Sequence, residues 1–298
     1  MNSADEQIGS PPPSGDVDFK AISEQYEQNV ETINELREQA RKGGGDQRWE
    51  KQHQKGRMTA RERIHKLVDD TEAFVEYGLL ASLEDEDEFP AAGIVTGLGE
   101  IENRTCAIVA HDATVKAGSH IRLTCRKTLH MQELASRLKI PIIYLVDSSG
   151  IYLPRQTEVF ADEGHFGSIF YNNSRMSADG IPQIAAIMGP CVAGGAYLPA
   201  LCDEILMVEG SHLFIAGPGL VKAAIGQEVD ADELGGAELH EEVSGTVDQR
   251  YEDDESCIEG IRSRVRDFPA DNRYLEQVAE EEPVYSPDQL YGFMSPER

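Results

Sequence analysis

Two stretches of the sequence place glycine where a buried strand turns into a helix, and both could hold a developing negative charge. Residues 144–151 read YLVDSSGI, and residues 188–197 read MGPCVAGGAY. Small residues let the backbone approach a ligand closely, and free N–H groups at a helix start favour an anion. Two such turns side by side can make an oxyanion hole for an enolate or tetrahedral oxygen. Either junction alone is better explained as a tight turn, but the two together favour a functional site.

Motifs for several other chemistries are absent from the sequence. It contains neither a GxxxxGK[ST] loop nor a GxGxxG after an apolar run, which disfavours nucleoside triphosphate and dinucleotide sites. HExxH and GxSxG are also missing, which disfavours a zinc peptidase and a hydrolase nucleophile elbow. His111 and Asp112 are adjacent and could work as acid and base, although a structural or turn role is favoured. Asp162, Glu163 and His165 match no known metal-ligand spacing, so no metal is predicted.

The glycine turns need a scaffold of buried strands, and the sequence indicates one. Short apolar runs alternate with helical stretches from Gly93 onward, which indicates an α/β domain with a largely parallel sheet. The expected strands are 94–98, 106–110, 141–146, 183–188, 205–208 and 213–215. The expected helices are 119–138, 166–178, 194–201 and 218–224, and the region after residue 227 is expected to be more helical and polar.

The beginning of the chain differs in composition from this alternating region. Residues 1–18 include three consecutive prolines and almost no apolar residues, so a flexible tail is expected. Apolar residues then recur at spacings of three and four from Phe19 to Ala40, which predicts an amphipathic helix that stops at the glycines 43–45. Thr59 and Glu62 form a capping-box pattern and predict a second helix within residues 57–67.

The charge of the chain is strongly acidic and unevenly distributed. There are 54 Asp and Glu against 27 Lys and Arg, a formal net charge of -27. Residues 105–222 hold 10 acids and 9 bases, a net charge of -1, so the remaining residues carry -26. Such a field repels phosphate, which argues against binding to nucleic acid or an anionic membrane. Adaptation to a high-salt cytoplasm is the favoured explanation, and a docking face for a basic partner is the alternative.

Cysteine usage and the N-terminal composition favour a cytoplasmic protein. The five cysteines are scattered and include no CxxC pair, which favours reduced, buried thiols over disulfides or a zinc site. No run of about 18 apolar residues is present to cross a membrane. The polar, acidic N-terminus is not a signal peptide.

Several ordered motifs resemble carboxyltransferase subunits of biotin-dependent acyl-CoA carboxylases. The turn VDSSG at 146–150 and the segments GIPQIA at 180–185 and 189–199 carry this resemblance. Within the family, three further motifs are most similar to the beta subunit of methylcrotonoyl-CoA carboxylase: LPRQ at 153–156, HFGSIFYN at 165–172 and GPGLVKAA at 217–224. The resemblance covers roughly residues 20–295.

The resemblance implies a fold and a division into domains. It implies a crotonase/ClpP-like spiral of ββα units, an α/β fold that agrees with the alternation of strands and helices. Residues 59–268 then form an acetyl-CoA carboxyltransferase N-terminal-type domain, preceded by a helical extension at 19–58. Residues 269–298 resemble a linker toward a C-terminal domain that this chain lacks. In the family the active site lies between the N-domain of one subunit and the C-domain of another, so half of the site is expected to be missing.

The resemblance also implies a mechanism. A coenzyme A thioester is the substrate, 3-methylcrotonyl-CoA-like or propionyl- or acetyl-CoA, and biotin arrives carboxylated on a separate carrier protein. The biotin supplies both the carboxyl group and the base, so the enzyme has to hold the thioester oxygen as charge develops on it. The implied site residues are the backbone N–H groups of Ser149, Gly150 and Ile151 for the oxyanion, and Gly194, Gly195 and Ala196 for the acyl-CoA pocket.

Two further expectations concern the phosphates of coenzyme A and the first turn. Arg126 and Lys127 are candidates for binding the phosphates, and an exposed helix face is an equally good explanation of both. The family usually has Gly-Gly where this chain has Ser149-Gly150, and the serine Cβ would restrict positive φ and narrow the turn.

Partners and competing functions follow from the missing half. The expected partners are the biotin carboxylase and biotin carrier subunit, together with a homo-oligomer or a complementary C-domain chain. One alternative function is a CoA-binding or assembly subunit without catalysis of its own. A second alternative is a subunit of a biotin-dependent acyl-CoA decarboxylase.

Overall fold

The apolar runs of the sequence pair into one sheet in the computed structural model, which describes residues 19–83, 89–160, 162–268 and 286. Residues 39–268 form one compact unit, and the described residues 19–38 belong to a second. The flexible tail expected at 1–18 lies outside the described residues, as does the linker expected at 269–298 except for Ser286. In the described part of the chain, no helix is long and apolar enough to cross a membrane.

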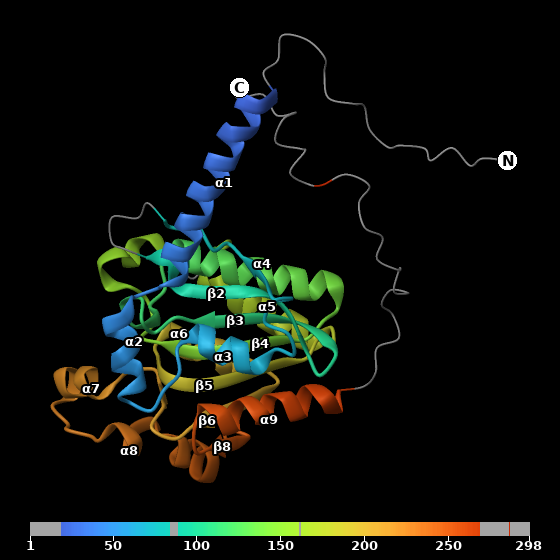
Figure 1. The fold of residues 1–298 in the computed structure, drawn as a ribbon. Coiled ribbons are helices and arrows are strands. Elements are labelled where there is room, and N and C mark those ends of the chain that lie inside the picture. The colour runs from blue at the N-terminus through green and yellow to red at the C-terminus, as the bar shows by residue number, and fades with distance from the viewer. Residues whose placement is uncertain (1–18, 84–88, 161, 269–285, 287–298) are drawn as a thin grey trace. The chain divides into compact units, whose positions relative to one another are not determined.

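The sheet has eight strands in the order β1-β2-β3-β4-β5-β6-β8, and β7 pairs with β5. Figure 1 shows the run from β2 to β8. The strands are β1 (Val75–Tyr77), β2 (Ile94–Ile101), β3 (Arg104–His111), β4 (Ile142–Ser148), β5 (Gln183–Val192), β6 (Glu204–Val208), β7 (His212–Phe214) and β8 (Gln249–Tyr251). The helices are α1 (Phe19–Arg41), α2 (Asp46–His53), α3 (Ala60–Leu67), α4 (Arg122–Leu138), α5 (Phe166–Ala178), α6 (Gly194–Ala200), α7 (Pro218–Ile225), α8 (Ala231–Gly235) and α9 (Asp254–Asp267).

Most of the sheet is parallel, as the sequence predicts. The pairs β1-β2 and β2-β3 are antiparallel, whereas β3-β4, β4-β5, β5-β6, β5-β7 and β6-β8 are parallel. All seven residues of β4 are buried, and so are eight of the ten in β5. Strands buried on both faces are typical of parallel sheets covered by helices, which explains why these runs are continuously apolar rather than alternating.

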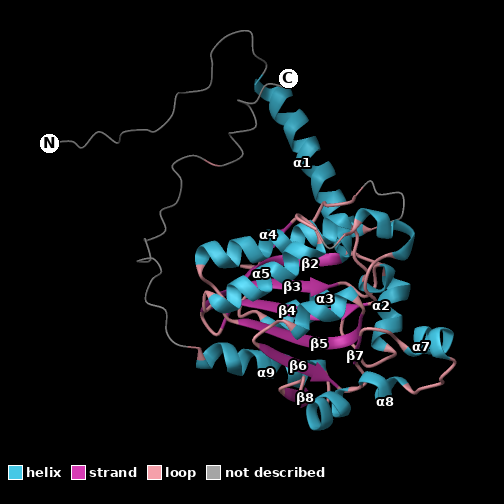
Figure 2. Cartoon of the chain, turned by 180° about the vertical axis from the view of Figure 1, so that it is seen from behind, coloured by secondary structure: helices cyan, strands magenta, loops and turns pink. Residues whose placement is uncertain are grey.

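Helices cover both faces of the sheet and divide the core into two main layers. Side chains of α4 and α5, such as Met131 and Ile169, pack on one face. Side chains of α3 and α9, such as Ile64 and Ile261, pack on the other face. Figure 2 shows the same layers from behind. Each face of the two central strands is therefore removed from water, which stabilises the edge where these strands end.

All six strands expected from the sequence are present, and the differences lie at their ends. β2 continues three residues past the expected range, to Ile101, and the helix expected from residue 119 begins at Arg122. The capping box is confirmed, because Thr59 Oγ1 accepts from the Glu62 N–H at 3.3 Å and Glu62 Oε2 accepts from the Thr59 N–H at 2.7 Å. Sequence reasoning missed β1 and β8, which have three residues each, and it did not set bounds for α2 or α9.

One arginine inside the core joins four of these elements. Arg63 on α3 is 1% exposed, and its guanidinium contacts three groups. Nη1 donates to Asp147 Oδ2 at 3.1 Å, Nε donates to Asp254 Oδ2 at 2.8 Å, and Nη2 donates to the Met188 carbonyl at 2.9 Å. The guanidinium thus ties α3 to the ends of β4 and β5 and to the start of α9.

Because residue 189 is a glycine, the Asp147 carboxylate has the space it needs to contact Arg63. A Cβ at position 189 would lie 2.1 Å from Asp147 Oδ1 and 2.3 Å from the carboxyl carbon of Asp147. No real Cβ approaches an oxygen so closely, and neither the buried strand nor the paired carboxylate is free to move away. The carboxylate of Asp147 therefore occupies the space above the backbone of the neighbouring strand.

We predict that Arg63→Met lowers the free energy of unfolding by about 3–5 kcal/mol, because the variant buries two carboxylates without their cation. Urea unfolding followed by circular dichroism at one fixed salt concentration measures the loss.

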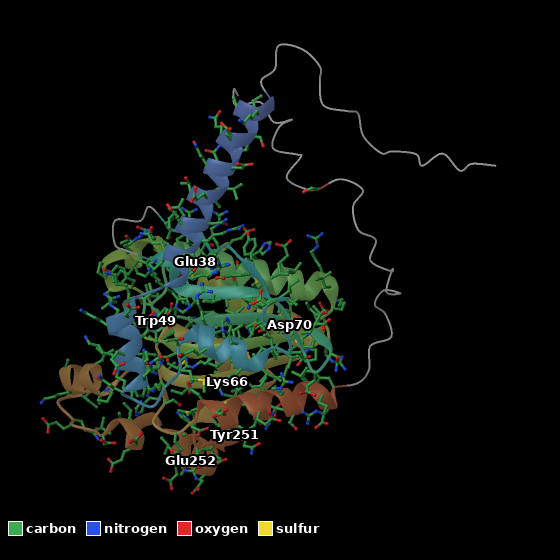
Figure 3. The ribbon with its side chains drawn as sticks, viewed as in Figure 1. Glu38, Trp49, Lys66, Asp70, Tyr251 and Glu252 are labelled. Atoms are coloured by element: carbon green, nitrogen blue, oxygen red, sulfur yellow. The ribbon has the colours of Figure 1, made fainter. Side chains whose placement is uncertain are left out.

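Lys66→Met is the matched control for this prediction. Lys66 also joins α3 to α9 (Figure 3), but its ion pair with Glu255 is exposed, with 48% of the lysine side chain accessible. We expect this variant to lose less than about 1 kcal/mol. Equal small losses in the two variants would contradict the role given to Arg63.

Candidate functional site

The two glycine turns lie side by side where the parallel strands β4 and β5 end. A Cβ on Gly150 would stand 2.9 Å from the Val192 carbonyl oxygen. A Cβ on Gly195 would stand 3.4 Å from Ser148 Oγ and 3.7 Å from the Gly150 Cα. The carboxyl ends of neighbouring parallel strands form the edge at which α/β proteins bind ligands. The turns around Gly150 and Gly195 are therefore in close contact at an edge suited to a ligand.

Serine at position 149 does not strain the first turn. The left-handed backbone conformation falls on Gly150, with φ of 92°, and Ser149 is not among the residues with positive φ. The expected narrowing of the turn assumed a positive φ at the serine, and that conformation is absent. A glycine is needed at 150, where positive φ and the Val192 carbonyl both exclude a side chain.

The backbone N–H groups of the first turn are not equally available. Ser149 N–H donates to the Ala117 carbonyl at 3.0 Å, and Gly150 N–H donates to Ser148 Oγ at 3.2 Å. Both bonds hold the turn in shape. Ile151 N–H makes no hydrogen bond with the described residues. Of the three donors expected from the sequence, Ile151 is thus the one left for a ligand, and the expectation is corrected for Ser149 and Gly150.

The second turn leads directly into α6. Ala193 precedes the helix with φ of 54° and ψ of -125°, and its N–H donates to the Phe214 carbonyl at 3.1 Å. Gly194 and Gly195 occupy the first turn of the helix, where backbone N–H groups have no carbonyl partner inside the helix. Ala196 N–H donates to the Ala193 carbonyl at 3.0 Å. The segment 194–196 thus combines a closely approachable backbone with two N–H groups that need an acceptor.

Three buried side chains that the sequence did not connect lie beneath the first turn. Ser148 Oγ lies 3.2 Å from His120 Nδ1, and His120 Nε2 lies 3.0 Å from His111 Nε2. The two histidines are nine residues apart on segments that meet only in the folded chain, so no spacing rule could have found them. The favoured structural role of Asp112 is confirmed, because its carboxylate accepts the Thr114 N–H at 3.0 Å in a tight turn.

Lys127 does not fit the expected role in phosphate binding. Its side chain is 4% exposed, and Nζ donates to the carbonyls of Ala91 and Ile94 at 2.9 and 2.6 Å. Burial lowers the pKa of Lys127 to about 7. The amino group of Lys127 is thus committed to the backbone that precedes and begins β2. This expectation is corrected, because a group turned into the core cannot reach a phosphate in solvent.

Arg126 lies on the exposed face of α4 and lines a surface cleft. The cleft has a volume of about 710 Å³, and Arg122 and His130 line it at the neighbouring turns of the same helix. The His130 ring stacks on Tyr77, with ring centroids 3.9 Å apart. Residues four apart on a helix project from the same face. The cleft therefore offers two exposed guanidinium groups in a row.

Two of the three residues considered as metal ligands face the same cleft. Glu163 and His165 line the cleft together with Arg126. Among the residues that the structure describes, no group of three or more His, Cys, Asp or Glu side chains is arranged to hold a metal ion.

The carboxyl transferase domain model matches residues 51–297. With more than half of the chain matched, the chain belongs to the carboxyl transferase domain family, as its motifs indicated. Within that family it is similar to beta chains of methylcrotonoyl-CoA carboxylases. It is 43% identical over 300 residues to the probable mitochondrial beta chain of Drosophila melanogaster. It is 46% identical over 258 residues to the biotin-dependent 3-methylcrotonyl-coenzyme A carboxylase beta1 subunit of Mycobacterium tuberculosis.

Solved structures confirm the expected fold class. The beta subunit of P. aeruginosa geranyl-CoA carboxylase aligns with a TM-score of 0.82 and 31% identity, over 95% of this chain and 54% of that chain. The α/β, crotonase-like fold implied by the motifs is therefore the fold of this chain.

The chain spans about half the length of its relatives. The match to the Drosophila protein covers 94% of this chain and 52% of the relative, and the match to the Mycobacterium protein covers 85% and 49%. About half of each relative therefore lies outside the match.

The buried position of Lys127 predicts a dependence of stability on pH. Between pH 7 and the ordinary lysine pKa of 10.5, the unfolded chain binds a proton that the folded chain has released. Stability rises with pH wherever the unfolded state binds more protons. We therefore predict that the unfolding free energy of the wild type rises by about 2 kcal/mol relative to that of Lys127→Met between pH 7 and pH 9.

Urea unfolding of both proteins at a series of pH values measures this difference. The buried cysteines titrate alike in the two proteins and cancel in the comparison. A difference that stays constant with pH would show that Lys127 keeps its proton in the folded core.

Proposed function

We propose that this chain is the acyl-CoA-binding half of a carboxyltransferase, which moves a carboxyl group from carboxybiotin to an acyl-CoA. The observation that carries the proposal is the close contact between the turn at Gly150 and the turn at Gly195. The two glycines let the turns pack closely at the edge where β4 and β5 end, and the half-buried residues Ile151 and Gly194 lie on the surface beside them. A thioester lies flat against such a surface, with its carbonyl oxygen within reach of backbone N–H groups.

The residues of the turns stabilise charge rather than transfer protons. The N–H groups of Ile151, Gly194 and Gly195 are donors that need an acceptor, and an enolate oxygen is a strong one. Carboxybiotin, when bound, supplies both the carboxyl group and a base for the acidic proton of the substrate. Apart from Asp147, whose carboxylate is paired with Arg63, the turns contain no acid or base of their own, which agrees with this division of work. Donors of this kind typically contribute a factor of about 10²–10³ each.

The substrate class follows from the relatives and from the cleft on α4. Because the similar proteins are named as methylcrotonyl- and geranyl-CoA carboxylases, we assign an acyl-CoA of the 2-enoyl class, with 3-methylcrotonyl-CoA first. The guanidinium groups of Arg122 and Arg126 are suited to the phosphates of coenzyme A. Arg126 keeps the role expected from the sequence, and Arg122 takes the place that was expected for Lys127.

An exposed apolar region supports a complementary domain as partner. None of the residues of α7 is buried, and Leu220 and Ile225 are 61% and 70% exposed. Ile215, just before this helix, is 56% exposed. Large apolar side chains that are exposed close together in the sequence favour an interaction site. We assign this surface to a C-terminal-type domain of a second chain or a second copy, and we expect a biotin carboxylase and carrier subunit to complete the enzyme.

Reconstitution tests the function. We expect this chain, mixed with the separately produced C-terminal half of a methylcrotonoyl-CoA carboxylase beta chain and a carboxylated carrier, to carboxylate 3-methylcrotonyl-CoA. Arg126→Ala should raise the KM for the acyl-CoA about tenfold through loss of a charge-assisted contact. The formation of labelled product from radioactive bicarbonate measures both effects.

The control is Arg137→Ala, on the same helix. Arg137 is 76% exposed, pairs only loosely with Glu133 and does not line the cleft, so its removal should leave KM unchanged. If no acyl-CoA accepts a carboxyl group, the proposal is wrong. Binding of coenzyme A without turnover would instead identify an assembly subunit.

We also propose that the protein works in a high-salt cytoplasm. The excess of acids, 54 against 27 bases, favours an environment in which salt screens their repulsion. The five free cysteines, four of them buried, fit a reducing compartment.

The charge predicts a strong dependence of folding on salt. We expect the chain to lose its circular-dichroism signal in dilute buffer and to regain it in molar KCl, because the self-repulsion of the -27 charge is then screened. Thermal melts recorded over a series of KCl concentrations test this. A midpoint that does not move with salt would contradict it.

A further inference from the structure

A hydrogen-bonded chain of three buried side chains ends at the first glycine turn. It begins at His111, the last residue of β3, passes through His120 just before α4, and reaches Ser148 at the end of β4. Successive atoms lie 3.0 Å apart (His111 Nε2 to His120 Nε2) and 3.2 Å apart (His120 Nδ1 to Ser148 Oγ). The exposed fractions of the three residues are 1%, 1% and 0%. The mechanism proposed above uses none of them.

The hydrogen bonds of Ser148 assign the protons along this chain. Ser148 Oγ accepts the Gly150 N–H at 3.2 Å, so its own proton needs an acceptor. Among the described residues, His120 Nδ1 is the acceptor within reach. The Gly150 carbonyl also lies 3.3 Å from His120 Nδ1, but a proton on Nδ1 would leave the Ser148 hydroxyl proton without an acceptor among the described residues.

The contact between the two imidazole rings then fixes the second proton. With Nδ1 of His120 as an acceptor, Nε2 carries the proton and donates it to His111 Nε2. If both rings were protonated, the Nε2–H groups of His111 and His120 would face each other across 3.0 Å, which excludes two charged rings. Burial lowers the pKa of His120 to about 4 and that of His111 well below its usual value, which agrees with two neutral rings. Phe166 packs against the His120 ring at a centroid distance of 4.7 Å and keeps it in place.

His120 also determines the direction of the peptide between Gly150 and Ile151. The Gly150 carbonyl points at the backbone N–H of His120, and the Tyr152 N–H donates to the His120 carbonyl at 3.0 Å. In a trans peptide the carbonyl and the N–H point in opposite directions. Ile151 N–H is therefore turned away from His120. The side chain of His120 contacts Ser148 Oγ, which accepts the Gly150 N–H and so holds the peptide between Ser149 and Gly150. His120 therefore holds the peptides on both sides of Gly150, one through its side chain and the other through its backbone.

We propose that His120, supported by His111 and acting through Ser148, is a positioning residue that aims the Ile151 N–H at the thioester oxygen. This inference rests on the proposed function, because the oxygen belongs to the proposed acyl-CoA substrate. The chain of hydrogen bonds is neutral, buried and directional. It holds a donor in place without adding a charge that would compete with the enolate.

Kinetics of reconstituted carboxyl transfer test the proposal. We expect His120→Phe to lower kcat about 10- to 100-fold, with KM for the acyl-CoA changing less than twofold, because a misdirected donor affects the transition state most. His120→Gln can still accept from Ser148 and donate to His111. Its decrease in log kcat should therefore be at most two thirds of that seen in His120→Phe. His65→Phe, the same change on the exposed face of α3, is the control and should leave both constants unchanged.

Ser148→Ala provides a second variant in case the phenylalanine variant fails to fold. It removes only the hydroxyl that joins His120 to the turn, and it should lower kcat in the same direction. A kcat within twofold of the wild type in His120→Phe, or in Ser148→Ala if the former is unfolded, would overturn the proposal.

Nuclear magnetic resonance separates this proposal from the proposed function, because it needs no turnover. With 15N-labelled full chain in KCl, we expect His120 to show a non-protonated Nδ1 and a protonated Nε2. His120→Gln and Ser148→Ala should shift the amide resonances of Gly150 and Ile151, whereas His65→Phe should not. If the wild type fails to transfer a carboxyl group but these shifts occur, the proposed function is wrong and the hold of His120 on the turn is supported. Unshifted Gly150 and Ile151 amides overturn the positioning role.

Discussion

The buried guanidinium of Arg63 is the contact on which the functional edge depends. A cation inside a core is tolerated only when all its partners are in place. Here the partners are Asp147 on β4, the Met188 carbonyl on β5 and Asp254 on α9. The first turn begins with Ser148, directly after one of these partners, and β5 runs on from Met188 to the second turn. Two helices that lie far apart in the sequence but on the same face of the sheet therefore fix the position of β4 relative to β5.

At that fixed edge, the proposed site would stabilise an enolate with backbone dipoles rather than charged side chains. The segment 105–222, which carries both turns, has a net charge of -1, and the remaining residues carry -26. An enolate is itself an anion, so its formation would be opposed by acidic groups nearby. Repulsion from distant acids is screened within about 8 Å at physiological ionic strength, and over still shorter distances in molar salt. The uneven distribution of charge is therefore compatible with anionic chemistry at the centre of an acidic protein.

Sequence patterns predicted the parts of the fold that rest on long apolar runs and failed where tertiary contacts decide. β4 and β5 are continuous buried runs, and both were found, although β4 runs two residues and β5 four residues past the expected end. β1 and β8 have three residues each and include charged ones, so they lack a periodic signal. The motifs located both turns, but the free donor at Ile151 could be told from the occupied one at Ser149 only by hydrogen bonds. Lys127 was misplaced because neighbours in a helix sequence point about 100° apart, so one faces solvent and the other the core.

The contact between Gly189 and Asp147 has a consequence for how such sequences can diverge. Because the carboxylate fills the space where a Cβ would stand, the two positions are not free to change independently. A larger residue at 189 is compatible with the fold only if the residue at 147 shrinks, and then Arg63 loses a partner and has to change as well. Drift at this edge therefore proceeds through linked substitutions at three sites far apart in the sequence. An alignment of many relatives should show these three positions either constant or changing together.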